Sequence, residues 1–289
     1  MINIIPAELP TPKLHEYLLG CVAPRPIAFV STIDSKGNVN LAPFSFFNVF
    51  GSNPPTLVFS PARSGRTGKT KHTLDNLYEV GECVVNIVSY DMIHQCNLAS
   101  AEFEKGVNEF ERAGFTQVPS SVVKPPRVGQ SKAHIECKVK QIIETGQGGG
   151  AGNLVICEVV ALHVDESVVD ENGSIVPDKF DYVARMGKNY WARIVPEAIV
   201  EMPKMPDATK VLGVNKMPDA IRLSNYLTGN EIALLANNTH LPADEAIEAA
   251  KNLPDVQQAI AANSLPQLVK DSIAKFDLEL ALKLAMLVK

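Results

Sequence analysis

A loop of basic and hydroxyl-bearing residues is the part of the sequence best suited to binding an anion. It reads Ser64-Gly-Arg-Thr-Gly-Lys-Thr70 and leads into a segment expected to be helical, Thr73–Glu79. Between Ser35 and Leu74 there is no Asp or Glu, whereas the cations Lys36, Arg63, Arg66, Lys69 and Lys71 give a local charge of +5. Backbone amides, hydroxyls and a helix start suit a phosphate monoester. The alternative is a solvated basic loop with no ligand.

A run of phenylalanines precedes this loop, between Phe44 and Phe50. Four of the chain's eleven Phe residues fall in these seven positions, together with Ser45 and Asn48. Such a run more often forms hydrophobic core, but buried Ser and Asn side chains need polar partners. A flat heteroaromatic ring with hydrogen-bonding edges would satisfy both kinds of side chain. The two segments together predict a cationic pocket without carboxylates beside a wall of Phe rings.

Other catalytic or nucleotide-binding motifs are incomplete. Gly146–Gly152 has Ala151 at the third glycine of GxGxxG and precedes a strand-like segment instead of a helix, so it is interpreted as a hairpin loop. Ser64–Thr70 has two residues between its glycines, where a P-loop has four. The histidines form no HExxH motif or His/Cys cluster, and Ser31 lies in no G-x-S-x-G motif. We therefore predict no metal site and no serine nucleophile.

The first 200 residues contain the strands that must position these side chains. Apolar runs and alternating patterns predict strands at 27–33, 39–42, 44–50, 56–60, 83–88, 133–145 and 154–164. The first two are separated by Asp34-Ser-Lys-Gly37 and predict a hairpin. Many strands joined by short turns, with few helices between them, favour a mainly β antiparallel barrel over a doubly wound sheet.

The composition changes near residue 205. All but two glycines and all but two aromatic residues precede it, whereas the last 85 residues hold 14 Ala and 14 Leu. Ala and Leu favour helix, which predicts an α-helical C-terminal extension at 205–289 after a first domain at 1–204. One apolar helical face is expected near the end, where large apolar residues recur at spacings of three and four: Ile273, Phe276, Leu280, Leu284 and Leu287.

Composition and charge restrict the class of protein. The chain has 289 residues and a net charge of −5, which argues against nucleic acid as a partner. No apolar run reaches the ~18 residues of a membrane helix, and the N-terminus lacks the pattern of a secretory signal. Five scattered cysteines without a CxxC pair fit reduced thiols. We expect a cytoplasmic protein with no membrane partner.

Several sequence blocks occur in a fixed order along the first two thirds of the chain. They are Pro24-Arg-Pro-Ile-Ala-Phe-Val-Ser-Thr32, Gly37-x-x-Asn40-Leu-Ala-Pro-Phe-Ser-Phe-Phe-Asn48, Pro54-Pro55, Lys71-His-Thr-x-x-Asn76, Gly81-Glu-x-x-Val-Asn86 and Leu154-Val-Ile-Cys-Glu-Val159. Together they resemble the flavin reductase-like, FMN-binding split-barrel family. The resemblance covers roughly residues 10–195, and the helical extension lies outside it.

The resemblance implies an antiparallel split β-barrel with flanking helices, a homodimer, and one non-covalent FMN per subunit near the dimer interface. Carried over by position, the residues at the flavin ring and ribityl chain would be Arg25, Ser31, Thr32, Ser45, Phe46, Phe47 and Asn48. Those at the phosphate would be Ser60, Arg66, Lys71 and Thr73. A later block near the flavin or the dimer contact supplies Arg185, Gly187 and Tyr190.

The sequence also departs from the family pattern. His72 replaces an acidic residue, Asn153 stands where a histidine is common, and Lys188-Asn189 interrupts a glycine-rich turn. The resemblance implies a flavin reductase that passes hydride from NADH or NADPH to FMN, with no catalytic acid or base assigned. Two alternatives remain open: an FMN electron carrier that exchanges electrons with a redox protein partner, and a non-enzymatic FMN-binding module.

Overall fold

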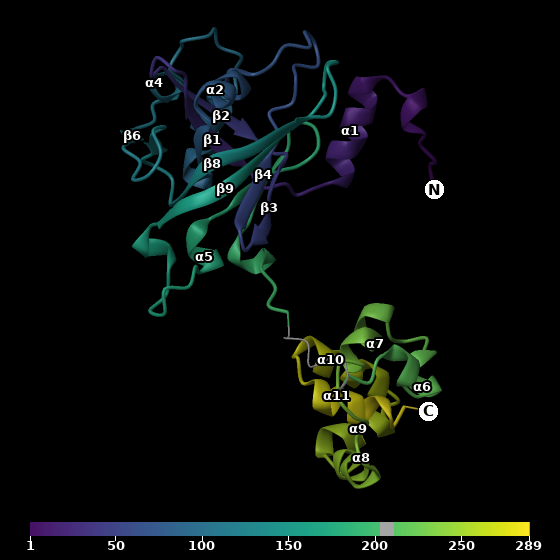
Figure 1. Cartoon of the computed structure of the whole chain (residues 1–289). Coiled ribbons are helices and arrows are strands. Elements are labelled where there is room, and N and C mark those ends of the chain that lie inside the picture. Colours follow the sequence, from purple (N-terminus) through teal and green to yellow (C-terminus); the bar gives the residue numbers. More distant parts are fainter. Residues whose placement is uncertain (203–210, 289) are drawn as a thin grey trace. The chain divides into compact units, whose positions relative to one another are not determined.

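The computed structural model describes residues 1–202 and 211–288. The chain divides into two compact units, Met1–Val200 and Glu201–Lys289, called here the barrel unit and the helical unit (Figure 1). The boundary expected between residues 204 and 205 lies outside the described residues.

The barrel unit is built on one antiparallel seven-stranded sheet with the strand order β2-β1-β5-β8-β9-β4-β3. Its strands are β1 (Ala28–Ile33), β2 (Val39–Phe44), β3 (Phe47–Ser52), β4 (Pro55–Phe59), β5 (Glu82–Ile87), β8 (Ala133–Glu144) and β9 (Asn153–Val164). Two short pairs accompany it: β6 (Gln117–Val118) with β7 (Arg127–Val128), and β10 (Val183–Arg185) with β11 (Trp191–Arg193). Each of the seven expected strands has a counterpart, but the strand expected at 44–50 begins only at Phe47, because Phe44 ends β2. The hairpin of β1 and β2 pairs Ser31 with Leu41.

The chain connectivity requires this sheet to curl into a split barrel. β2 and β3 are the two edges of the sheet, yet only Ser45 and Phe46 separate them in the sequence. From Phe44 to Phe47 the chain spans at most about 10 Å, so the opposite edges must approach each other at this point. The expected antiparallel split barrel is thereby confirmed.

Helices fill and cover the barrel. They are α1 (Thr11–Cys21), α2 (His72–Val80), α3 (Ile93–Leu98), α4 (Glu109–Ala113) and α5 (Pro177–Phe180), with short 3-10 turns at Pro6–Glu8, Tyr90–Met92, Glu166–Val168 and Pro196–Ala198. α2 packs Leu74 and Leu77 into the barrel core, against Val30 and Phe59. The opposite face of β1 packs Phe29 into a second core with residues of α3 and α4. Both faces of β1 are therefore buried, which explains its nearly continuous apolar sequence.

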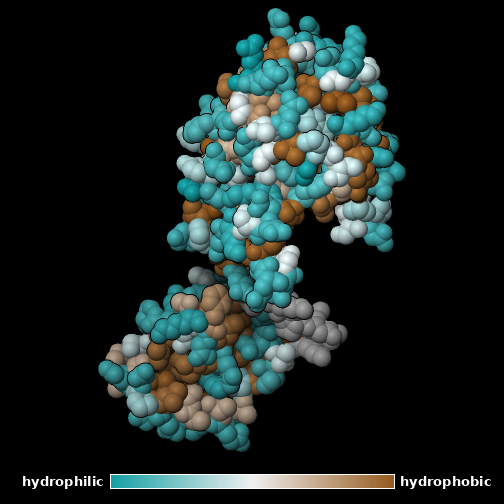
Figure 2. All heavy atoms as spheres, turned by 90° about the vertical axis from the view of Figure 1, so that its left-hand side faces the viewer, coloured by the Kyte–Doolittle hydropathy of each residue, from teal (hydrophilic) through white to brown (hydrophobic). Residues whose placement is uncertain are grey.

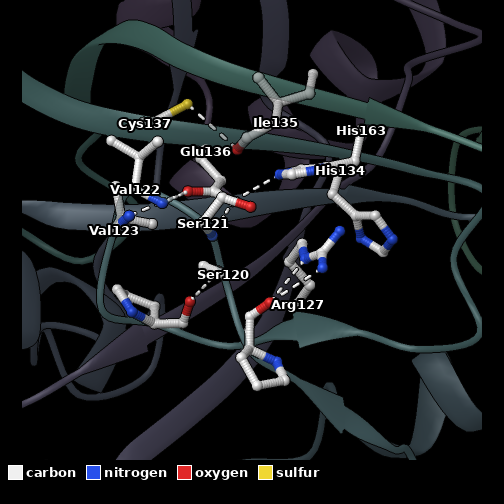
Figure 3. A network of polar contacts seen from close by, with 12 residues as sticks. Ser120, Ser121, Val122, Val123, Arg127, His134, Ile135, Glu136, Cys137 and His163 are labelled. Atoms are coloured by element: carbon white, nitrogen blue, oxygen red, sulfur yellow. Dashed lines mark hydrogen bonds and ion pairs between the residues drawn. The ribbon is translucent and has the colours of Figure 1, made fainter.

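A buried carboxylate anchors the loop that joins β6 and β7 (Figure 3). Glu136 of β8 is fully buried and accepts hydrogen bonds from the backbone N–H of Ser121 (2.7 Å), Val122 (2.7 Å) and Val123 (3.0 Å). The Nε2 of His163 on β9 lies 2.6 Å from a carboxylate oxygen of Glu136. Burial alone would raise the pKa of Glu136, but these donors outweigh it and lower the pKa to about 2. The carboxylate is thus ionised, and His163 donates through Nε2–H.

His134 lies beside this network and faces Arg127 (Figure 3). Its Nδ1 is 2.9 Å from Oδ1 of Asn86, which also accepts from the backbone N–H of Val128. Burial, with smaller contributions from the charges of Arg127 and His163, lowers the pKa of His134 to about 4. His134 is therefore neutral at physiological pH.

The helical unit has its own hydrophobic core. Its elements are a 3-10 turn at Val214–Lys216, α6 (Asp219–Arg222), α7 (Gly229–Leu235), α8 (Asp244–Lys251), α9 (Pro254–Ala261), α10 (Leu265–Ala274) and α11 (Leu278–Ala285). Ile221, Leu235, Val269 and Leu284 are fully buried in this core. The apolar face expected to continue through Phe276 is interrupted, because Phe276 has φ 58° and an exposed side chain between α10 and α11.

Within the described residues, no helix is both long and apolar enough to cross a membrane. On the face of the barrel unit shown in Figure 2, hydrophilic side chains predominate and apolar ones form small, separate patches.

Candidate functional site

A cleft with two lobes lies in the barrel unit. Cavities of about 370 and 330 Å³ share the lining residues Pro43, Phe44, Lys71 and Ser100, so they form one continuous depression. We call the first the basic lobe and the second the aromatic lobe, after their side chains. The end of β2 and the loop that precedes α2 contribute lining residues to both lobes.

The basic lobe is lined by the predicted anion-binding loop. The lining includes the ammonium groups of Lys69 and Lys71 and the hydroxyls of four residues: Ser64, Thr67 and Thr70 of the loop and Thr73 of α2. α2 begins at His72, so the N-terminus of this nine-residue helix also meets the lobe. Thr73 is buried, and its Oγ1 accepts a hydrogen bond of 2.9 Å from Asn40. The lobe thus combines ammonium groups, hydroxyls and a helix N-terminus, as phosphate binding requires.

Arg63 and Gly149 hold this loop in place. The Arg63 guanidinium bonds Glu144 (3.1 Å), Gln147 (2.8 Å) and the backbone oxygen of Gly68 (3.3 Å). A Cβ on Gly149 would lie 2.9 Å from the backbone oxygen of Gly65, so only glycine allows this approach. The glycine-rich segment is the β8–β9 hairpin loop, as predicted, and it packs against the anion-binding loop.

Two carboxylates line the basic lobe, so the expectation of a pocket without them is wrong. Glu102 comes from the segment between α3 and α4, and Glu109 from the start of α4. Glu102 pairs with Lys71 at 2.6 Å and with Arg66 at 2.8 Å. Glu109 is buried and accepts from the backbone N–H of Leu41 at 2.9 Å, and burial raises its pKa. Both residues lie outside the stretch between Ser35 and Leu74 that contains no Asp or Glu. The fold brings them next to the residues of that stretch that line the lobe.

The aromatic lobe is lined by rings from three separate segments. Phe44 is the last residue of β2 and Phe46 lies in the β2–β3 connection, while Trp191 comes from β11 and His15 from α1. His15 and Phe46 meet edge to face with ring centroids 6.2 Å apart. Ser45, Ser60 and Arg185 add polar groups to the same lobe, and the Arg185 guanidinium lies 5.0 Å from the centroid of the Trp191 ring. Flat apolar walls with polar groups beside them suit a planar heteroaromatic ligand.

Arg25 joins the elements around the aromatic lobe and does not line it. Its side chain is buried and donates to the backbone oxygens of Leu19 (2.6 Å), Val22 and Met186 (2.9 Å). Its Nε also lies 3.4 Å from the hydroxyl of Ser45. Arg25 thus ties the end of α1 to the β10–β11 turn and to Ser45.

Ser31 and Thr32 are buried inside the barrel unit, away from the cleft lining. Ser31 donates to the backbone oxygen of Pro126 at 2.5 Å, and Thr32 accepts from Asn76 at 3.1 Å. Their polar atoms are therefore used within the fold, and neither residue enters the site proposed below.

The remaining residues expected at the site are spread over several places. Phe47 packs against the barrel core, and Asn48 is exposed and accepts from the N–H of Val49. Ser60 is buried in the aromatic lobe, and its hydroxyl oxygen accepts a hydrogen bond of 3.0 Å from the backbone N–H of Asn153.

Three more of the expected residues lie outside the cleft. The Arg66 side chain is 83% exposed and does not line either lobe. Tyr190 and Gly187 line a separate depression beside α1.

The residues present fit a phosphorylated planar cofactor. The cationic lobe adjoins the aromatic lobe, and Phe44 and Lys71 belong to both. No group of His, Cys, Asp and Glu in the described parts of the chain has the arrangement of a metal site.

The fold is the split barrel of flavin reductases. The chain belongs to the family of flavin reductase like domains, whose model matches residues 19–182. FMN binding is typical of this family.

The chain is similar to several known proteins. It is 36% identical to an uncharacterized protein of Aquifex aeolicus over 64% of this chain and 91% of that one. Among solved structures, it resembles component B of the nitrilotriacetate monooxygenase of Bacillus cereus, at 30% identity and a TM-score of 0.65, over 70% of this chain and 98% of the other. It also resembles the 2-nitrobenzoate 2-nitroreductase of Pseudomonas fluorescens, at 29% identity and a TM-score of 0.62, over 72% of this chain and all of the other.

Proposed function

We propose that this protein binds FMN in the two-lobed cleft and works as a flavin reductase that takes hydride from NADH or NADPH. The observation that carries the proposal is the continuity of a cationic lobe and an aromatic lobe through Phe44 and Lys71. Membership of the flavin reductase like family supports it.

In this proposal the basic lobe binds the phosphate of FMN and the aromatic lobe binds its ring. In the basic lobe, Lys69 and Lys71 balance the phosphate charge, and Ser64, Thr67 and Thr70 donate hydrogen bonds. In the aromatic lobe, Phe44, Phe46 and Trp191 hold the flavin ring and exclude water from it. When bound, FMN supplies the chemistry of hydride acceptance. The protein's contribution is to place two rings face to face, which requires no acid or base from the chain.

Rapid mixing of the FMN-loaded protein with NADH or NADPH tests this activity. We expect the visible absorption band of the flavin to disappear with at least one of them. Free FMN mixed with the same nucleotide is the control. Retention of the band with both nucleotides, in a protein that does bind FMN, would contradict the reductase. Reduction by a reduced ferredoxin alone would instead indicate an electron carrier.

We extend the proposal to a homodimer. β3 is an edge strand of the sheet and exposes Val49 and Phe50, by 59% and 68%. A second copy covering this strand would remove both side chains from water. Sedimentation equilibrium of the purified chain should give twice the mass of one chain, and Phe50→Asp should shift the equilibrium to monomer. A wild-type chain that sediments as a monomer contradicts the dimer.

Two further parts of the proposal concern the surroundings of the enzyme. All five cysteines are free, and Cys83, Cys96, Cys137 and Cys157 are buried, which is consistent with a reducing cytoplasm. By similarity to a monooxygenase component, we propose that a redox protein partner receives the electrons.

A further inference from the structure

Glu102 forms an ion pair with Lys71, the cation that both lobes of the proposed site share, and with Arg66, which lies outside the lining. Its two carboxylate oxygens lie 2.6 Å from Nζ of Lys71 and 2.8 Å from an Nη of Arg66. Glu102 itself lines the basic lobe. The hydrogen bonds from Lys71 and Arg66 lower the pKa of Glu102, so it is a carboxylate at neutral pH.

A carboxylate and a phosphate monoester use the same features of these side chains. Each presents anionic oxygens to an ammonium and a guanidinium through short charge-assisted hydrogen bonds. A phosphate monoester carries about −1.5 to −2 charges near neutral pH. It cannot share Lys71 with Glu102 without strong repulsion between the two anions at close range.

We propose that Glu102 is a specificity-determining residue that competes with the flavin phosphate for Lys71. Glu102 thereby limits how tightly FMN is held and speeds its release. This inference rests on the proposed function, and it makes FMN an exchangeable ligand of the enzyme.

The ion pairs of Glu102 are exposed to solvent, which supports the inference that a phosphate can displace Glu102 from Lys71. The side chain of Glu102 is 47% exposed and that of Arg66 is 83% exposed. Ion pairs so accessible to water are weak, so a phosphate can break them. After displacement, Glu102 stays in the lining of the lobe, and its charge continues to repel the phosphate.

The test is the variant Glu102→Gln, which keeps the shape and removes the charge. FMN and riboflavin are titrated into wild-type and variant protein, because riboflavin has the same ring and no phosphate. We expect FMN to bind about tenfold more tightly to the variant and to dissociate correspondingly more slowly. Riboflavin affinity should change less than twofold. Glu104→Gln is the matched control, since Glu104 lies two residues away in the same segment and forms no ion pair within the described residues; its FMN affinity should stay unchanged.

Other outcomes overturn the inference in distinguishable ways. Unchanged or weaker FMN binding by Glu102→Gln means that Glu102 does not compete and at most orients Lys71. An equal gain for FMN and riboflavin means that Glu102 acts on the cleft as a whole. If wild-type protein binds neither flavin, the proposed function fails and the inference fails with it.

Discussion

Replacing Glu136 by Gln should lower the free energy of unfolding of the barrel unit by about 3–5 kcal/mol. The wild-type carboxylate is fully buried and accepts from three backbone N–H groups and from His163. A Gln side chain offers one oxygen, so its NH₂ group would face donors that have no other acceptor. The loop around Ser121–Val123 would lose its anchor (Figure 3).

The pH dependence of stability gives this prediction a second signature. The pKa of Glu136 is about 2 in the fold, against an ordinary value of 4.5, so the unfolded chain binds more protons between these values. Its stabilisation is therefore complete above pH 4.5 and is lost as the pH falls toward 2, by about 3 kcal/mol in total. His134, with a pKa of about 4 against 6.5, removes stability as the pH falls from 6.5 to 4.

Urea unfolding, followed by Trp191 fluorescence from pH 7 to pH 2.5, measures both effects. The Glu136→Gln variant should be less stable at pH 7 and should lack the loss below pH 4.5, while keeping the loss between 6.5 and 4. Glu158→Gln is the matched control, because the Glu158–Lys140 pair at 2.9 Å lies on the surface of the same sheet. A Glu136→Gln variant as stable as this control at pH 7 would show that the buried network does not stabilise the fold.

Lys71→Ala should weaken FMN binding by about ten- to a hundredfold. Lys71 lines both lobes, and one charge-assisted hydrogen bond contributes about 1.5–3 kcal/mol. Arg66→Ala is the matched control, since its exposed side chain lies outside the lining; we expect a loss of about threefold or less.

Fluorescence titration with FMN and with riboflavin checks the role of Lys71. Riboflavin should bind to wild type and Lys71→Ala with similar affinity, because the ring contacts in the aromatic lobe remain. An equal loss of affinity for FMN and riboflavin would mean that Lys71 contacts the flavin ring or stabilises the fold, and does not bind the phosphate. An Arg66→Ala defect larger than that of Lys71→Ala would mean that the phosphate binds on the outer side of the loop.

Local sequence patterns predicted most of the barrel, because hairpins and apolar alternation depend on neighbouring residues. The β1–β2 hairpin, the buried strand β5 and the long β8–β9 hairpin follow from such patterns. The basic loop and the Phe run were also visible as continuous segments. The break at Phe276 was not predicted, because spacing alone does not show where a helix ends.

The polar contacts of the site depend on long-range packing and could not be predicted from local patterns. Ser31 and Arg25 fall in the expected sequence block, yet both side chains serve the fold. Glu102 lies 31 residues from Lys71, and no motif connects them. His15 and Trp191 both line the aromatic lobe, although they lie near opposite ends of the sequence of the barrel unit.

A crystal structure of the chain with FMN bound tests the central claim most directly. We predict the phosphate in the basic lobe, within hydrogen-bonding distance of Lys71 Nζ, with the ring between Phe44, Phe46 and Trp191 and the Glu102 carboxylate moved off Lys71. FMN located outside this cleft, or bound with the ring in the basic lobe, would contradict the account.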